Sequence, residues 1–84
     1  MNRRKLLKRL AGGALYNVSF NAARDLLEGF GFRLSRVSGS HHIFEHPEIP
    51  DLLNLQEIGG EAKPYQLRQF LRLVERYDLQ LEGD

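Results

Sequence analysis

The chain has no cysteine among its 84 residues, which excludes both a disulfide framework and a metal site built from thiolates. It also has no apolar run long enough to cross a bilayer, so we expect no membrane-spanning segment. Neither sign of charge dominates, because 12 Lys and Arg side chains stand against 11 Asp and Glu, for a formal net charge of +1. Global charge therefore indicates no class of partner, and only its distribution along the chain can.

Two further absences narrow the function. The glycine pairs Gly12-Gly13 and Gly59-Gly60 match neither the Walker nor the dinucleotide pattern, so no phosphate-cradling loop is expected. A chain of this length builds only one small core, which predicts a single domain over residues 1–84. The lack of cysteine fits a reducing compartment, and we expect a cytoplasmic protein.

Basic side chains crowd the amino end of the chain. Such a segment can contact phosphate backbones, or it can be the solvated face of a helix, which is the commoner case. The segment resembles the start of a twin-arginine export signal, but Lys8 and Arg9 interrupt the apolar run that such a signal needs, so export is not expected. The basic residues are Arg3, Arg4, Lys5, Lys8 and Arg9.

Helical spacing of apolar residues predicts three helices. The first covers residues 3–11, and the second begins at Ser19 or Asn21, both of which are good helix caps. The third begins near Pro64, a residue suited to a first helical turn. The pattern fixes no structure for residues 14–20. The expected buried stripes are Ala23, Leu26, Leu27 and Phe30 in the second helix, and Leu67, Phe70, Leu71, Val74 and Tyr77 in the third.

Alternation of apolar and polar residues predicts three short strands between the second and third helices, over residues 32–37, 41–46 and 52–56. Ser38-Gly39-Ser40 is a tight hairpin signal between the first two. Strands joined by such short loops pair as an antiparallel meander. We therefore predict an α+β two-layer sandwich, with a three-stranded antiparallel sheet, helices on one face and an extra amino-terminal helix.

The histidines carry the clearest chemistry, because imidazole exchanges protons near neutrality. A metal site is not expected, since adjacent strand residues such as His41 and His42 point to opposite faces, and His42 and His46 are roughly 13 Å apart at the usual strand rise. If Phe44 faces the core, His41 lies on the open face beside the turn. The arrangement with Ile43 inside stays open, as does an ordinary surface role for His41.

Arginine and lysine side chains flank the strands that carry these histidines. Arg33 and Arg36 precede the hairpin, and Lys63 precedes the last helix. Together with the amino-terminal cluster they can hold a polyanion near His41. The alternative is ordinary solubilising charge.

Residues 32–47 resemble the signature of HicA-type toxins, the YcfA-like family. The resemblance centres on the Gly39-Ser40-His41-His42 run and its flanking strands. The end of the preceding helix, Glu28-Gly29-Phe30-Gly31-Phe32, and the position of the closing helix from Lys63-Pro64 are also similar to that family. The resemblance covers roughly residues 19–79, so residues 1–18 form an additional helical segment and connector.

The resemblance implies a double-stranded-RNA-binding-like fold. It also implies a ribosome-independent mRNA endoribonuclease that needs no metal or other cofactor and is neutralised by a HicB-type antitoxin in a hetero-oligomer. The family's catalytic histidine directly follows Gly-Ser, which corresponds to His41, and the turn that supports it corresponds to Gly39 and Ser40. Weaker candidates for RNA contact are Arg33, Arg36, Lys63, Arg68 and Arg72.

One segment departs from the family pattern. The family often has a basic stretch with histidine and proline after its third strand, whereas residues 56–61 are polar and acidic here. This departure weakens the expected RNA surface. The alternatives are therefore a non-catalytic RNA-binding module, or a protein-interaction module of the same fold.

Overall fold

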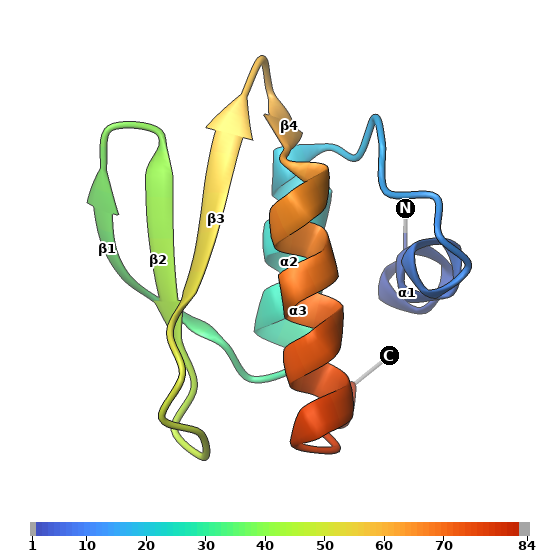
Figure 1. Ribbon diagram of the computed structural model, residues 1–84, viewed down its shortest axis with the longest axis vertical. Coiled ribbons are helices and arrows are strands. Elements are labelled where there is room, and N and C mark those ends of the chain that lie inside the picture. Colours follow the sequence, from blue (N-terminus) through green and yellow to red (C-terminus); the bar gives the residue numbers. More distant parts are fainter. Residues whose placement is uncertain (1, 83–84) are drawn as a thin grey trace.

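The computed structural model describes residues 2–82, and Met1, Gly83 and Asp84 lie outside the described residues. The predicted α+β class is confirmed (Figure 1). Within residues 2–82 the sheet has four strands instead of three, all antiparallel, in the order β1-β2-β3-β4. No helix of that range is long and apolar enough to span a membrane. The elements are α1 (Arg3–Ala11), α2 (Phe20–Gly29), β1 (Arg33–Ser38), β2 (His41–Glu45), β3 (Leu53–Ile58), β4 (Glu61–Ala62) and α3 (Pro64–Arg76).

β4 is the strand that the sequence pattern did not predict. Gly59 and Gly60 both have positive φ, at 58° and 80°, and they return the chain at once onto β3. The segment before α2 then pairs with β4, since Ala62 N–H donates to the Val18 carbonyl at 2.9 Å. The connector that the pattern left unassigned is thus held against the sheet, and Ser19 caps α2.

The core lies on one face of the sheet, which we call the inner face. Phe44 of β2 and Leu53 and Leu55 of β3 are buried there, and α2 and α3 both contact β3. The expected inward position of Phe44 is therefore confirmed, and the alternative with Ile43 in its place is wrong. Ile43 pairs with Asn54 on the opposite face, which we call the outer face.

β1 is an edge strand in which side chains do not alternate regularly between the two faces of the sheet. A bulge between Leu34 and Arg36 shifts the register, so Leu34 and Val37 both pair with inner-face residues of β2. They are still 46% and 52% exposed, because β1 projects beyond the helices (Figure 1). The strand runs from 33 to 38 instead of the predicted 32 to 37.

α3 buries a face that is rotated from the predicted stripe. Leu67, Phe70 and Leu73 are buried with the polar Gln66, whereas three residues of the predicted stripe are only half-buried. Leu71 and Val74 line an open apolar groove of about 340 Å³ between α3 and α1, whereas Tyr77 bonds to Asp51 on another side of α3. The half-buried residues are Leu71, Val74 and Tyr77.

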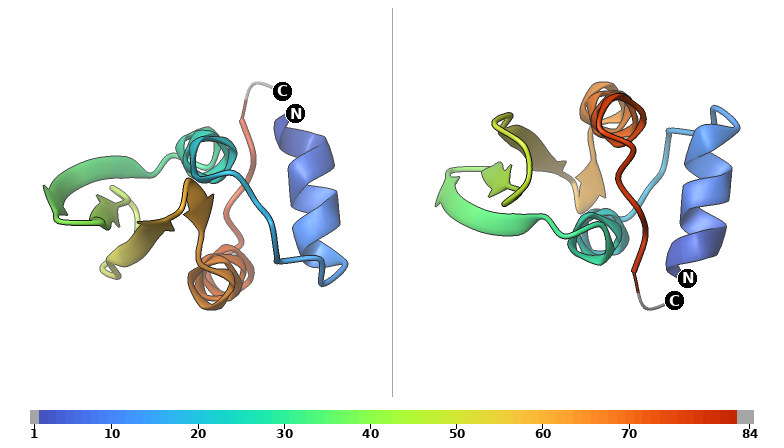
Figure 2. Two further views of the ribbon diagram at one scale, coloured as in Figure 1. Left: turned by 90° about the horizontal axis from the view of Figure 1, so that it is seen from above. Right: turned by 90° about the horizontal axis from the view of Figure 1, so that it is seen from below.

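α1 is joined to α2 by an ion pair and by apolar contacts. The Arg3 guanidinium contacts the Asp25 carboxylate through two bonds, of 2.9 and 3.0 Å, and Leu6 and Leu10 are buried. The segment that follows α3, up to Glu82, passes between α1 and the rest of the molecule (Figure 2), where Glu82 N–H donates to the Gly29 carbonyl at 2.9 Å. The amino-terminal helix is therefore packed into the fold from two sides.

His46 joins the end of α2 to the segment after β2. It is only 8% exposed, and both ring nitrogens are used: Nε2–H donates to the Phe30 carbonyl at 2.8 Å, and Nδ1 accepts from Glu48 N–H at 3.1 Å. Gly31 makes the close approach possible, since a Cβ there would lie 2.8 Å from His46 Nε2. His46 is therefore a structural residue.

Gly31→Ala should destabilise the protein more than Gly13→Ala. Both glycines have φ of +97°, so both variants carry the cost of left-handed backbone, about 1–2 kcal/mol. Gly13 has open space around it, whereas a Cβ at Gly31 displaces His46 from its buried hydrogen bond, which adds about 1–3 kcal/mol. Urea unfolding of the two variants measures the difference, and equal losses would contradict this account of His46.

Asp25 should make the folding stability of the protein decrease at acid pH. The hydrogen bond from Arg3, with its positive charge, lowers the pKa of Asp25 below its ordinary value. Because the folded pKa is the lower one, this contribution is present at neutral pH and is lost as pH falls below about 4, through the folded pKa. Urea unfolding from pH 7 to pH 3 measures the free energy of unfolding of wild type and of Asp25→Asn. The difference between the two proteins should shrink as the pH falls, and a difference that stays constant with pH would contradict the role given to the Arg3–Asp25 contact.

Candidate active site on the outer face of the sheet

His41 is the first residue of β2 and follows a two-residue turn. Gly39 has φ of +59° and Ser40 has negative φ, the signs of a type II′ turn, and Ser38 pairs with His41 across it. Glycine at the first turn position is therefore required by the backbone. The His41 side chain is exposed on the outer face, as the alternation along β2 predicted.

The outer face around His41 is polar on one side and basic on the other. His41 pairs with Gln56 of β3, and Ile43 pairs with Asn54 of β3 and with Arg36 of β1. Paired residues of antiparallel strands lie on the same face. The imidazole therefore lies on the same face as two carboxamides from β3, and Arg36 of β1 stands on that face opposite Ile43, two residues further along β2.

The carboxamides of Asn54 and Gln56 connect β3 to the turn end of the β1–β2 hairpin. Both ends of the Asn54 amide lie within bonding distance of His41 Nδ1, with Oδ1 at 3.2 Å and Nδ2 at 3.0 Å. Gln56 Nε2–H donates to the Ser40 hydroxyl at 3.2 Å. Within the described residues no bond engages His41 Nε2, so this nitrogen is open to a ligand.

A buried side chain of α3 extends this support to the core. The Gln56 backbone N–H donates to Oε1 of Gln66 at 2.6 Å, and Gln66 is buried. Asn54, Gln56 and Gln66 were not among the residues predicted to support the site. The signal for the first two was present, because they alternate with Leu53 and Leu55 and so had to share the face opposite the core.

The other two histidines are turned away from the outer face. His42 donates Nδ1–H to the Ser40 carbonyl at 3.1 Å, and its ring lies against Phe20 with centroids 4.5 Å apart. His46 is buried on the same side. Residues 2–82 contain no group of three or more His, Cys, Asp or Glu side chains placed to share one ion.

The predicted RNA-contacting cations separate into two sets. Arg33 and Arg36 lie on β1, in the same hairpin as His41; Arg33 is 3.7 Å from Glu45, and Arg36 has no ion-pair partner in the described part of the chain. Lys63, Arg68 and Arg72 instead belong to the start and exposed side of α3, which packs on the inner face. The structure therefore brings only the first set into the hairpin of His41, where Arg36 pairs with Ile43, two residues from His41, and Arg33 pairs with Glu45 at the other end of β2.

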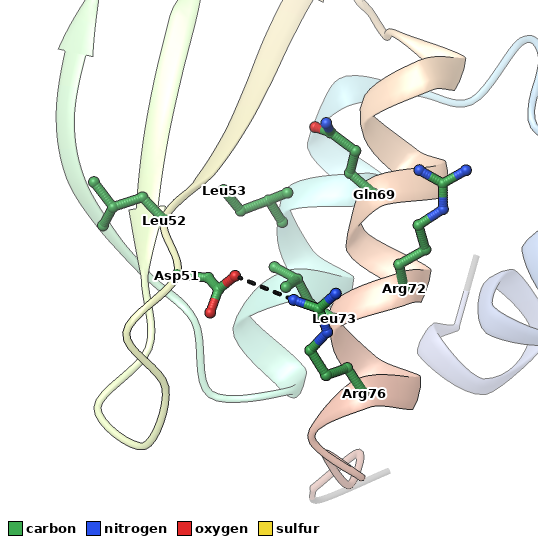
Figure 3. Close-up of a pocket in the computed structure, with 7 residues that line it drawn as sticks. All are labelled: Asp51, Leu52, Leu53, Gln69, Arg72, Leu73 and Arg76. Carbon is green, nitrogen blue, oxygen red and sulfur yellow. Dashed lines mark ion pairs between the residues drawn. The ribbon is translucent and has the colours of Figure 1, made fainter.

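A hollow of about 220 Å³ lies between α3 and the segment before β3, and it does not include His41 (Figure 3). Asp51 organises it: the carboxylate accepts Tyr77 O–H at 2.6 Å and lies 3.9 Å from the Arg76 guanidinium. The bond to Asp51, with burial, raises the pKa of Tyr77. These contacts fasten the segment before β3 to α3, so the hollow is explained as part of the scaffold. Its lining residues are Asp51, Leu52, Leu53, Gln69, Arg72, Leu73 and Arg76.

Comparison with known proteins gives one match. A family described as the HicA toxin of bacterial toxin–antitoxin systems matches residues 23–75, which is more than half of the chain and spans the segment from α2 to α3 that includes β2 and His41. No curated protein and no solved structure matches the chain. The match leaves α1 and the connector outside the shared region.

The three histidines should differ in their reactivity toward diethyl pyrocarbonate, which modifies accessible imidazole. His41 is exposed, His42 is half-buried and His46 is buried with both nitrogens engaged, so the rates should fall in that order. Mass spectrometry of peptides from the briefly treated native protein measures the order. Slow modification of His41 relative to His46 would show that the imidazole is enclosed.

Proposed function

The chain belongs to the HicA toxin family of bacterial toxin–antitoxin systems, and we propose that it is an mRNA endoribonuclease in which His41 is the acid–base residue. The observation that carries the proposal is the exposed imidazole at the mouth of the β1–β2 hairpin, with Nε2 unengaged by the described residues. It occupies the position at which the family resemblance puts the catalytic histidine.

The chemistry needs little from the protein, because RNA carries its own nucleophile in the 2′-hydroxyl. His41 Nε2 takes the 2′-hydroxyl proton, the 2′-oxygen bonds to phosphorus, and the bond from phosphorus to the 5′-oxygen breaks. The leaving 5′-oxygen takes a proton from water, and His41 returns its proton to solvent. The products are a 2′,3′-cyclic phosphate and a 5′-hydroxyl. General base help of this kind is typically worth about 10²–10⁴-fold.

The outer face supports binding of a single strand beside His41. Arg36 and Arg33 flank the imidazole strand and can pair with phosphate oxygens, which positions the backbone without reading its sequence. Ile43 offers an apolar contact to a base between them. Lys63, Arg68 and Arg72 contribute a more distant attraction to the backbone, which weakens as salt is raised. Glu57 and Glu61 are exposed on β3 and β4, so the strand should avoid that end of the sheet.

The family implies an antitoxin partner, and we propose a HicB-type antitoxin that forms a hetero-oligomer with this chain. Because mRNA is the proposed substrate, the proposed place of action is the cytoplasm. Neutralisation requires the partner to keep RNA from His41.

His41→Ala should abolish RNA cleavage and growth arrest. The change removes the only proposed proton acceptor, so the cleavage rate should fall by about 10²-fold or more. Since the His41 side chain is exposed, stability should change by less than about 0.5 kcal/mol. The measurement combines cleavage of purified mRNA in the presence of a metal chelator with growth after induced expression, with and without the antitoxin.

Each result has a distinct meaning. Equal cleavage by wild type and His41→Ala would sink the assignment of His41, and loss of wild-type cleavage in the chelator would contradict a metal-free mechanism. Wild-type protein that retains RNA at low salt but neither cleaves it nor arrests growth would instead be a non-catalytic RNA-binding module. Failure to retain RNA would leave the protein-interaction alternative.

A further inference from the structure

The contact between Asn54 and His41 joins residues from two strands at the proposed reacting group. They are not directly opposite each other: Asn54 pairs with Ile43, and His41 pairs with Gln56. The carboxamide therefore reaches diagonally across the outer face, where Oδ1 and Nδ2 lie 3.2 and 3.0 Å from the same imidazole nitrogen. In the part of the chain that the structure describes, this is the only hydrogen-bond partner of the His41 ring.

The two amide ends have opposite consequences for His41. If Nδ2–H donates to the ring, Nδ1 is the acceptor and Nε2 carries the proton of the neutral imidazole. If Oδ1 accepts from the ring, Nδ1 carries that proton and the Nε2 lone pair is free. Only the second arrangement lets neutral His41 take a proton at its open nitrogen. The same acceptor still serves after proton transfer, because imidazolium has N–H groups at both positions.

We propose that Asn54 is a positioning residue for His41, whose side-chain oxygen accepts the Nδ1–H and leaves the Nε2 lone pair directed toward the RNA. The choice of Oδ1 over Nδ2 rests on the proposed ribonuclease activity, whereas the contact between Asn54 and the His41 ring does not. An amide achieves the orientation without a formal charge, so it does not favour imidazolium as a carboxylate would. Asn54 thus holds the ring in the form that a general base needs.

The structure of the sheet fixes the position of the Asn54 side chain relative to His41. Leu53 and Leu55 on either side of Asn54 are buried, so the carboxamide must point to the outer face. The Gln66 and Gln56 contacts hold β3 and the hairpin turn together two residues further along. The imidazole and its acceptor are therefore carried by strands whose relative position is fixed from the core.

Long-range proton–nitrogen NMR of the ¹⁵N-labelled chain at about pH 8, where imidazole is mostly neutral, reports the tautomer of each histidine. Wild-type His41 should be mainly Nδ1–H. In Asn54→Leu the ratio should move toward Nε2–H by about fivefold, the effect of losing one ordinary hydrogen bond. Equal ratios in the two proteins would overturn the proposal.

The other histidines are internal controls in the same spectrum. His42 should be Nδ1–H because it donates to the Ser40 carbonyl, and His46 should be Nε2–H because it donates to Phe30. Both should be unchanged in Asn54→Leu, which shows that the fold is intact. Gln69→Leu is the matched variant, since it removes a carboxamide of α3 that bonds to Tyr65 and is remote from the His41 hairpin, and its His41 tautomer should equal that of wild type.

Asn54→Asp keeps the acceptor and provides a second test. The Nδ1–H tautomer should persist, and its replacement by Nε2–H would overturn the proposal. For RNA cleavage, Asn54→Leu should lower kcat about fivefold with KM little changed, and Asn54→Asp should shift the pH–rate profile toward higher pH because a carboxylate favours imidazolium. A wild-type chain that shows the expected tautomer but no cleavage would refute the proposed function and leave the positioning contact established.

Discussion

The alternation of side chains along β2 is the constraint on which the site depends. Phe44 is the large apolar residue of this strand, and its burial against the helices fixes which face every neighbour occupies. His42 must then lie beside Phe20 on the inner face, while His41 must lie outside. A shift of one residue in register would exchange the two histidines, so the same burial that stabilises the fold also selects the histidine that is available for chemistry.

The hairpin that carries His41 combines exposure with rigidity. The hairpin projects beyond the helices, as Figure 1 shows. Its turn is nevertheless fixed, because the Gln56 side chain donates to the Ser40 hydroxyl and the Gln56 backbone N–H donates to the buried Gln66 of α3. Arg33 and Arg36 stand on the adjacent strand of the same hairpin. The core thus positions an imidazole and two guanidinium groups on one exposed hairpin, an arrangement that suits the proposed ribonuclease because rigid elements hold the groups in place.

Much of the fold and part of the site could be read from the sequence, because they depend on local patterns. The cap at Ser19, the Gly39 turn and the outward position of His41 follow from residue type and spacing. β4 was not predicted, because a strand of two residues is too short to show an alternating pattern. The bulge in β1 was not predicted either, because one inserted residue leaves no mark in the composition. The bond from Asn54 to His41 depends on the register between two strands, and register is fixed only when the core has formed.

The chemistry of the RNA ends tests the central claim most directly. A base that takes the proton of the 2′-hydroxyl makes RNA cleave itself, so the account predicts fragments that end in a 2′,3′-cyclic phosphate and begin with a 5′-hydroxyl. Mass spectrometry of fragments released by the purified chain identifies these groups. Fragments with a 3′-hydroxyl and a 5′-phosphate would show that water attacked the phosphorus, and would contradict the role assigned to His41.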